Sequence, residues 1–220
     1  MILPNFFIIG APKAGTTALY DMIKQHPEIY VSPRKSPRFF ATEGEPPLFP
    51  GPAGDSLRRW AVWKPRDYAL LFAGVTNQRA IGEASVGYLR TPLAAQRIHQ
   101  YLPESRIIAI LRQPAERAYS HYMYMRQHRR EPARTFEEAL AQEETRIKEG
   151  WISGYYYKAN GLYYAQLSIY YDLFPREQIK ILLYDDLKDA PHPLLRDLFH
   201  FLDVDENFTP EIRRSNVTLA

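Results

Sequence analysis

Short apolar runs, each followed by a segment of helical spacing, constrain the fold of this chain more than any other feature. The clearest runs are Phe6–Ile9, Arg106–Arg112 and Ile179–Tyr184, and Ala80–Glu83 is a weaker one. Unbroken runs of this length are typical of strands buried on both faces. Strands that alternate with helices form right-handed crossovers and parallel sheets. The sequence therefore predicts a three-layer α/β fold, with a central, mainly parallel sheet flanked by helices.

The segments between these runs carry helix signals. We expect helices over residues 15–25, 92–102, 135–149, 162–173 and 193–202, and a further one that starts at Pro114. Thr135, with Glu138 three residues later, has the pattern of a capping box. Residues 42–65 are rich in proline and are expected to form a long loop. We expect one domain over residues 1–220, because this length suits a single core.

Composition limits the chemistry that the chain can perform. It has no cysteine, which excludes disulfides, thiol nucleophiles and zinc–thiolate sites. The 28 Lys and Arg against 25 Asp and Glu give a net charge of +3, too small to indicate nucleic-acid binding. The N-terminus has no basic leader, and its apolar run is far shorter than the ~20 residues of a membrane span. We therefore expect a cytoplasmic protein without a nucleic-acid partner or membrane span; the sequence leaves its oligomeric state open.

The turn after the first predicted strand, Gly10–Thr17, has the frame of a phosphate-binding P-loop. Backbone N–H groups and the following helix N-terminus would surround an anion there. A nucleoside-triphosphate site needs lysine directly after the second glycine, but that position is Thr16, and the lysine is Lys13, inside the turn. Such a site also needs an acidic residue at a neighbouring strand end to organise Mg²⁺. Arg112 stands there instead, so the sequence indicates anion chemistry without a metal.

A second basic segment follows the strand over residues 106–112. Arg112, Arg117 and Ser120 gather around the strand end and the predicted helix. Ser120 lies six residues beyond Pro114, about 9 Å along a helix, and arginine side chains can span that gap. The sequence thus indicates two phosphate sites, one on the first loop and one near Arg112 and Ser120. Two plainer interpretations stay open: Arg112 pairs with Glu116, or Ser120 bonds to its own helical turn.

These two segments together carry a family resemblance. Residues 12–17, PKAGTT, and 111–120, LRQPAERAYS, resemble the signature of sulfotransferases that use 3′-phosphoadenosine 5′-phosphosulfate (PAPS). The likeness is closer to the heparan-sulfate type and its bacterial relatives. It covers nearly the whole chain, including residues 82–89 and 161–164. The resemblance implies a P-loop-like fold and sulfuryl transfer without a metal to a hydroxyl or amine of a carbohydrate, lipid or small molecule.

The resemblance also implies which residues bind the nucleotide. Arg112 and Ser120 would bind the 3′-phosphate, and Tyr163 would lie near the nucleotide. Lys13 would also neutralise the charge that builds on the bridging oxygen as the sulfuryl group leaves. The residues implied for the 5′-phosphosulfate are Lys13, Ala14, Gly15, Thr16 and Thr17.

The chain departs from its relatives at the expected general base. Heparan-sulfate relatives place a glutamate before a His-Phe-Phe-like stretch, whereas this chain has Ser36 and Arg38 at the glutamate and histidine positions. Glu83 is the first alternative base, and His121 is the second. Acceptor contacts are predicted for three basic residues of the same stretch, Arg34, Lys35 and Arg38.

Two alternative functions stay open at this level. One is a nucleotide kinase or other P-loop phosphotransferase, which the missing Gly-Lys-Ser/Thr order disfavours. The other is a degenerate protein that binds PAPS without catalysis, which the substitution at Ser36 favours. The relatives also continue beyond the position of Ala220 into a segment that folds over the nucleotide, so the sequence predicts a shortened C-terminus.

Overall fold

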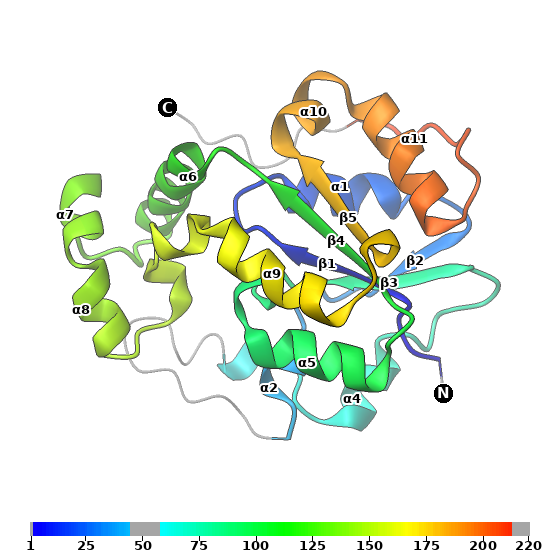
Figure 1. Cartoon of the computed structure of the whole chain (residues 1–220), viewed down its shortest axis with the longest axis horizontal. Coiled ribbons are helices and arrows are strands. Elements are labelled where there is room, and N and C mark those ends of the chain that lie inside the picture. The colour runs from blue at the N-terminus through cyan, green and yellow to red at the C-terminus, as the bar shows by residue number, and fades with distance from the viewer. Residues whose placement is uncertain (1, 45–57, 213–220) are drawn as a thin grey trace.

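A computed structural model of the chain describes residues 2–44 and 58–212 (Figure 1). Five strands form one sheet in the order β2-β3-β1-β4-β5, and every neighbouring pair is parallel. The strands are β1 Phe6–Gly10, β2 Ile29–Val31, β3 Ala80–Ala84, β4 Arg106–Leu111 and β5 Ile179–Leu183. The sheet and the glycine loop after its central strand confirm the predicted P-loop-like α/β fold.

Helices lie on both faces of the sheet. Figure 1 shows α1 and α11 on one face and α5 and α9 on the other, which gives the three predicted layers. The α-helices are α1 Thr16–Ile23, α2 Phe39–Thr42, α4 Pro65–Leu70, α5 Pro92–Tyr101, α6 Pro114–Gln127, α7 Phe136–Ala141, α8 Glu143–Lys148, α9 Tyr163–Leu173, α10 Tyr184–Asp189 and α11 Pro191–Leu202. The short 3-10 helices are η1 Tyr88–Arg90, η2 Ser153–Tyr155, η3 Ala159–Gly161 and η4 Arg176–Gln178.

The central strand explains why the sheet forms where it does. All five residues of β1 are buried, and β3 and β4 pair with it on either side. Apolar side chains from both faces join one core that includes Leu19 of α1, Ile98 of α5 and Leu198 of α11. An unbroken apolar strand suits this position, because helices cover it above and below.

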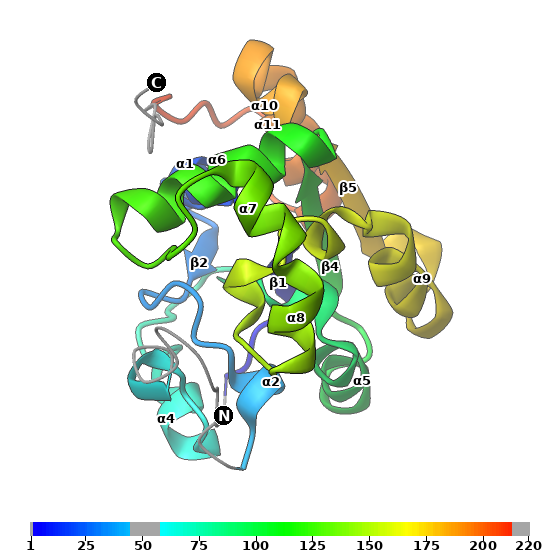
Figure 2. The ribbon, with the colours of Figure 1, turned by 90° about the vertical axis from the view of Figure 1, so that its left-hand side faces the viewer.

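The carboxyl ends of the strands meet at one edge of the sheet. In Figure 1 the arrowheads of β1, β4 and β5 point toward α6, and Figure 2 looks onto this edge with α6, α7 and α8 in front of the sheet. Arg146 of α8 donates to buried Glu131 at 2.7 Å and so ties α8 to the segment after α6. Ligands of open α/β sheets bind outside the carboxyl ends, so the site is to be sought at this edge.

The structure corrects several predicted boundaries. The strand β2 and the helix α10 were not predicted, and the helix predicted over 135–149 is divided into α7 and α8. The capping box at Thr135 is confirmed, because its hydroxyl accepts from the backbone of Glu138 and the Glu138 side chain bonds back. Most of the loop predicted over 42–65 lies outside the described residues. Within the described part of the chain, no helix is long and apolar enough to cross a membrane.

Candidate active site

The first loop leads from the end of β1 into the N-terminus of α1. Lys13 has a φ of +67° and Gly15 a φ of +86°, so the turn passes twice through the left-handed region. At Gly15 an added Cβ would come within 2.9 Å of the Tyr184 ring and 3.1 Å of Leu187. Tyr184 and Leu187 of α10 thus leave no room for a side chain at position 15. The first loop therefore packs closely against α10.

Replacing Gly15 by alanine is expected to destabilise the fold more than the same change at Gly44. Both glycines have a positive φ, which costs an alanine about 1–2 kcal/mol, but a Cβ at Gly44 meets nothing within 4 Å. The crowding at Gly15 adds about 1–3 kcal/mol. Denaturant unfolding of both variants measures this difference. Equal losses of stability would contradict the close packing of the loop against α10.

Two lysines gather on this loop. The Lys13 ammonium lies over the Tyr124 ring of α6, 4.4 Å from its centroid. Burial and the nearby Arg112 lower the pKa of Lys13. Lys35 donates to the Thr17 hydroxyl at 2.8 Å. Burial lowers the pKa of Lys35 to about 8. The negative charge of Asp21 opposes this shift, and the positive charge of Lys13 adds to it.

The placement of Lys35 differs from its predicted role. The sequence assigned this lysine to the acceptor, whereas the structure places its ammonium on the helical side of the first loop, against Thr17. The positive charge of Lys13 contributes to the lowered pKa of Lys35. An anion bound between the two lysines would relieve the repulsion of their like charges.

The end of β4 presents Arg112 to the same edge. Its guanidinium lies over the Tyr184 ring at 4.5 Å, and its Nε donates to a Glu116 carboxylate oxygen at 3.1 Å. Tyr163 donates its hydroxyl to the Arg112 carbonyl at 2.9 Å, which brings the start of α9 to the strand end. The predicted neighbours Arg112 and Tyr163 are thus together, and the ion pair with Glu116 that the sequence left open is present.

Ser120 and His121 lie on the inner side of α6, each with 7% of its surface exposed. Among the described residues, the Ser120 hydroxyl has no hydrogen-bond partner. His121 Nδ1 lies 3.5 Å from Arg117 Nη1. Burial, followed by the charges of Arg117, Arg90 and Lys13, holds the pKa of His121 well below its ordinary value. The imidazole is therefore neutral near pH 7.

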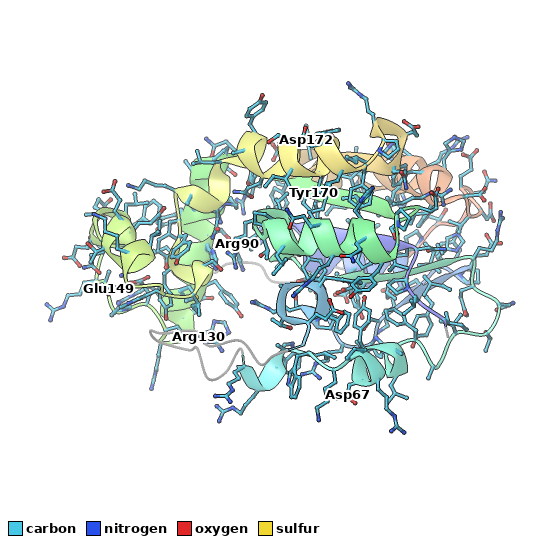
Figure 3. The ribbon with its side chains drawn as sticks, turned by 60° about the horizontal axis from the view of Figure 1, so that its bottom comes forward. Asp67, Arg90, Arg130, Glu149, Tyr170 and Asp172 are labelled. Carbon is cyan, nitrogen blue, oxygen red and sulfur yellow. The ribbon has the colours of Figure 1, made fainter. Side chains whose placement is uncertain are left out.

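Arg90, which sequence reasoning missed and which Figure 3 labels, lies close enough to Arg38 and Arg117 for their charges to lower its pKa. Arg117 is fully buried, and Arg38 and Arg90 are half-buried. Its Nη1 donates to the Ser153 carbonyl at 2.9 Å and to Asn160 Oδ1 at 3.1 Å. Burial, together with Arg38 and Arg117, lowers the pKa of Arg90 to about 9. None of these three arginines forms an ion pair with a carboxylate of the described residues. Such a group attracts anions, because it carries uncompensated positive charge.

Glu83, the first predicted base, lies inside the core at the end of β3. None of its surface is exposed. Its carboxylate accepts from Ser85 at 2.6 Å, Tyr88 at 2.7 Å and Tyr68 at 3.1 Å. Burial raises the pKa of Glu83 to about 7 against the opposing effect of these three hydroxyls. A substrate hydroxyl has no direct path to this carboxylate in the described conformation.

Arg34, predicted to contact the acceptor, is turned toward Trp60. Its guanidinium lies 4.9 Å from the Trp60 ring centroid and donates to the Trp60 carbonyl. Trp60 in turn donates its indole N–H to the Lys35 carbonyl at 3.2 Å. Arg34 therefore supports the segment that carries Lys35 and Arg38.

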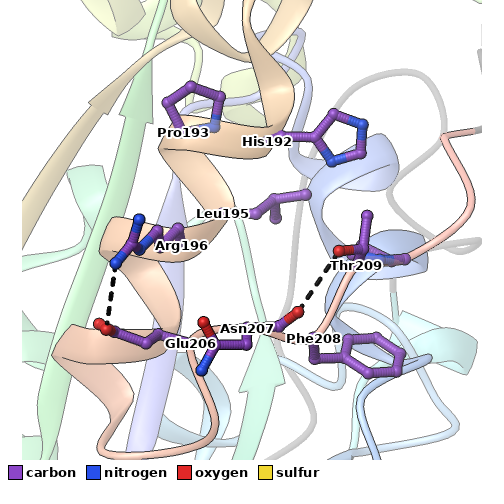
Figure 4. A pocket seen from close by; sticks show the side chains of 9 residues that line it. His192, Pro193, Leu195, Arg196, Glu206, Asn207, Phe208 and Thr209 are labelled. Carbon is purple, nitrogen blue, oxygen red and sulfur yellow. Dashed lines mark hydrogen bonds and ion pairs between the residues drawn. The ribbon is translucent and has the colours of Figure 1, made fainter.

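A hollow of about 350 Å³ lies apart from these residues, between α11 and the segment over residues 206–210 (Figure 4). Its lining includes His192, Arg196, Glu206 and Thr209. None of the predicted site residues contributes to it. The described residues also contain no group of three or more His, Asp or Glu side chains arranged to hold a metal ion.

Comparison with known proteins agrees with this geometry. The sequence model of the Sulfotransferase family matches residues 4–210. The crystal structure of a sulfotransferase from Alicyclobacillus acidocaldarius superposes with a TM-score of 0.91 and 39% identity over 99% of this chain and 87% of that one. Mouse sulfotransferase SULT7A1 complexed with PAP gives a TM-score of 0.61 at 17% identity over 93% of this chain and 61% of that one.

The curated relatives are longer proteins. Membrane-associated sulfotransferase kil1 of Dictyostelium discoideum is 23% identical over 99% of this chain, which spans 59% of kil1. Because the family match extends over almost all of the described sheet and helices, the chain belongs to the sulfotransferase family.

Proposed function

We propose that this chain transfers a sulfuryl group from PAPS to a hydroxyl or amine of a carbohydrate, lipid or small-molecule acceptor. One observation carries the proposal: β1 and β4 are neighbouring parallel strands, so Lys13 on the loop after β1 and Arg112 directly after β4 lie at the same edge of the sheet. Two cations at the same edge of the sheet suit a ligand with a phosphate at each end. A protein that bound Mg-ATP would need an acidic residue where Arg112 stands.

The residues present fit PAPS. The N–H groups that open α1, with Lys13, Thr16 and Thr17, would hold the 5′-phosphosulfate. Arg112 and the hydroxyl of Ser120, which has no hydrogen-bond partner in the described part of the chain, would hold the 3′-phosphate, with Tyr163 beside them. When bound, the nucleotide supplies the activated sulfuryl group.

The chain's own groups then assist the transfer. Lys13 holds a positive charge at the loop, where it stabilises negative charge that develops as the sulfuryl group departs. Of the two predicted bases, His121 has 7% of its surface exposed whereas Glu83 has none, so His121 is the candidate to receive the acceptor's proton. Normal turnover in a His121→Gln variant would remove that assignment. Arg38 and Arg90 would face the acceptor.

A binding comparison tests the function against the kinase alternative. We expect 3′-phosphoadenosine 5′-phosphate (PAP) to raise the melting temperature and Mg-ATP to have little effect. A ligand at 100 times its Kd stabilises a protein by about 2.7 kcal/mol, which raises the melting temperature by roughly 5–10 °C for a chain of this size. Stabilisation by Mg-ATP but not by PAP would contradict the proposal.

Label transfer separates catalysis from binding alone. PAPS labelled with ³⁵S is offered with a panel of sugar, lipid and phenol acceptors, and we expect at least one acceptor to receive label. If PAP binds and no acceptor is labelled, the chain is a PAPS-binding protein without catalysis.

A further inference from the structure

The hydrogen bonds around Glu83 have a fixed direction. The Ser85 hydroxyl accepts from the backbone N–H of Arg38 at 3.0 Å, and the Tyr88 hydroxyl accepts from the backbone N–H of Phe40 at 3.2 Å. An N–H group only donates, so each hydroxyl must turn its single hydrogen elsewhere. Both turn it to the Glu83 carboxylate, at 2.6 and 2.7 Å.

Two relays therefore run from the backbone of residues 38–40 to one carboxylate. Each relay passes from N–H to hydroxyl to carboxylate, and the carboxylate is the shared end point. Hydrogen bonds to the ionised carboxylate, the form that predominates above the Glu83 pKa of about 7, are about twice as strong as neutral ones. Since Glu83 is fully buried, no water competes for its oxygens.

The segment that these relays hold has an unusual backbone. Ser36 has a φ of +59° and Arg38 a φ of +61°, although neither is glycine. Left-handed backbone costs a non-glycine residue about 1–2 kcal/mol. Such conformations persist where surrounding contacts fix them, and they gather at functional sites. The contacts here include Ser36, which donates its N–H to the Ala84 carbonyl at 2.8 Å.

The same segment carries the side chains that face the proposed site. Lys35 precedes it and bonds to Thr17 on the first loop. Arg38 has an intermediate exposure and forms no ion pair or side-chain hydrogen bond with the described residues. The left-handed turn decides where this guanidinium lies, because a change in φ swings the whole side chain.

We propose that Glu83 is a positioning residue, which acts through Ser85 and Tyr88 to hold residues 36–40 in the shape that presents Arg38 to the acceptor. This inference rests on the proposed function. It replaces the predicted role of Glu83 as the general base. It also explains why a carboxylate stands in the core beside three hydroxyls, where an apolar residue would otherwise be expected.

Tyr68 offers a matched control for this role. Its hydroxyl donates to the same carboxylate at 3.1 Å, and its ring stacks on Phe39 at 4.2 Å. No hydrogen bond joins the Tyr68 hydroxyl to the backbone of residues 36–40. Tyr68→Phe thus removes one buried bond to Glu83 while it leaves both relays and the ring contact in place.

The test compares three variants of the full chain: Ser85→Ala, Tyr88→Phe and Tyr68→Phe. Each keeps the Glu83 carboxylate, so none places an unpaired charge in a new setting. Amide hydrogen exchange at Arg38 and Phe40 is measured together with PAP affinity and transfer of ³⁵S label. We expect Ser85→Ala to speed exchange at Arg38, and Tyr88→Phe at Phe40, by about tenfold or more, the effect of one lost buried hydrogen bond.

The activity readout separates positioning from general stability. We expect both relay variants to lower kcat/KM for a labelled acceptor by about tenfold while PAP affinity stays within twofold of the wild type. Tyr68→Phe should keep both exchange rates and kcat/KM.

The positioning role of Glu83 and the proposed function would be contradicted by different results. Equal behaviour of Ser85→Ala, Tyr88→Phe and Tyr68→Phe in exchange would overturn the positioning role, whether or not an acceptor is found. Failure of the wild type to bind PAP would instead overturn the proposed function, and the exchange comparison would still decide whether Glu83 holds the segment.

Discussion

Replacing Lys13 by alanine is expected to lower the rate of sulfuryl transfer by roughly 10²–10³-fold, the usual loss when one donor to developing charge is removed. The effect should appear mainly in kcat, because backbone N–H groups of the first loop and Arg112 still hold the nucleotide. Lys13 is suited to this task by its place in the turn, where the Tyr124 ring of α6 holds its ammonium close to the loop. Single-turnover transfer of ³⁵S label measures the effect directly.

Lys24 is the control for this experiment. It lies at the other end of α1, is exposed, and has no contact with the first loop. Lys24→Ala also removes one lysine charge, but from the far end of the helix that follows the loop, and it should leave transfer unchanged. A Lys13→Ala enzyme that turns over as fast as Lys24→Ala would exclude Lys13 from the catalytic site.

Replacing Arg112 by alanine is expected to weaken PAP binding by about 10- to 100-fold, the range for a lost hydrogen bond to a charged group. The Arg112 side chain is held between Tyr184 and Glu116 at the end of β4. Calorimetric titration with PAP measures the loss, and kcat at saturating PAPS should change much less.

The Glu116→Gln variant distinguishes a phosphate contact from a purely structural ion pair. Glu116 is more than half exposed, so its pairing with Arg112 adds little to stability. If Arg112 binds the 3′-phosphate, loss of the competing carboxylate should leave PAP affinity unchanged or tighter. Weaker binding in Glu116→Gln, equal to that of Arg112→Ala, would mean that the ion pair itself maintains the site.

Much of the fold followed from apolar periodicity. The runs that became β1, β3, β4 and β5 are long enough to stand out as buried strands. The strand β2 has three residues, Ile29–Val31, directly after a His-Pro pair that signals a turn. The strand β2 forms because it pairs with β3. A pattern of three residues is too short to predict such a pairing. The division between α7 and α8 at Gln142 likewise arises from tertiary packing around buried Glu143 and Arg146.

The two proposed anion sites could be predicted from the sequence because motifs that bind phosphates are local. Lys13 and Thr16 lie on one turn, and Arg112 and Ser120 lie on one strand-to-helix junction. The proximity of Arg38, Arg90 and Arg117 was harder to predict, because the three arginines come from separate segments. Arg90 follows residues 82–89, which the sequence had already singled out, so that stretch was the one available signal.

The position of Glu83 in the sequence did not reveal how its side chain is placed. Glu83 stands at a strand end on the correct edge, which favours a catalytic interpretation. Its side chain nevertheless points into the core, where hydroxyls from α4 and η1 surround it. Successive side chains of a strand point to opposite faces of the sheet. When both faces are buried, the sequence of one strand does not show which way Glu83 points.

The most direct test of the account compares two nucleotides on two proteins. Adenosine 5′-phosphate lacks the 3′-phosphate that PAP carries, so their ratio of affinities isolates the second anion site. We expect the wild type to bind PAP at least tenfold more tightly, and Arg112→Ala to lose most of that preference, in keeping with about 1.5–3 kcal/mol for a charged hydrogen bond. Equal affinities for the two nucleotides in the wild type would contradict the two-site account.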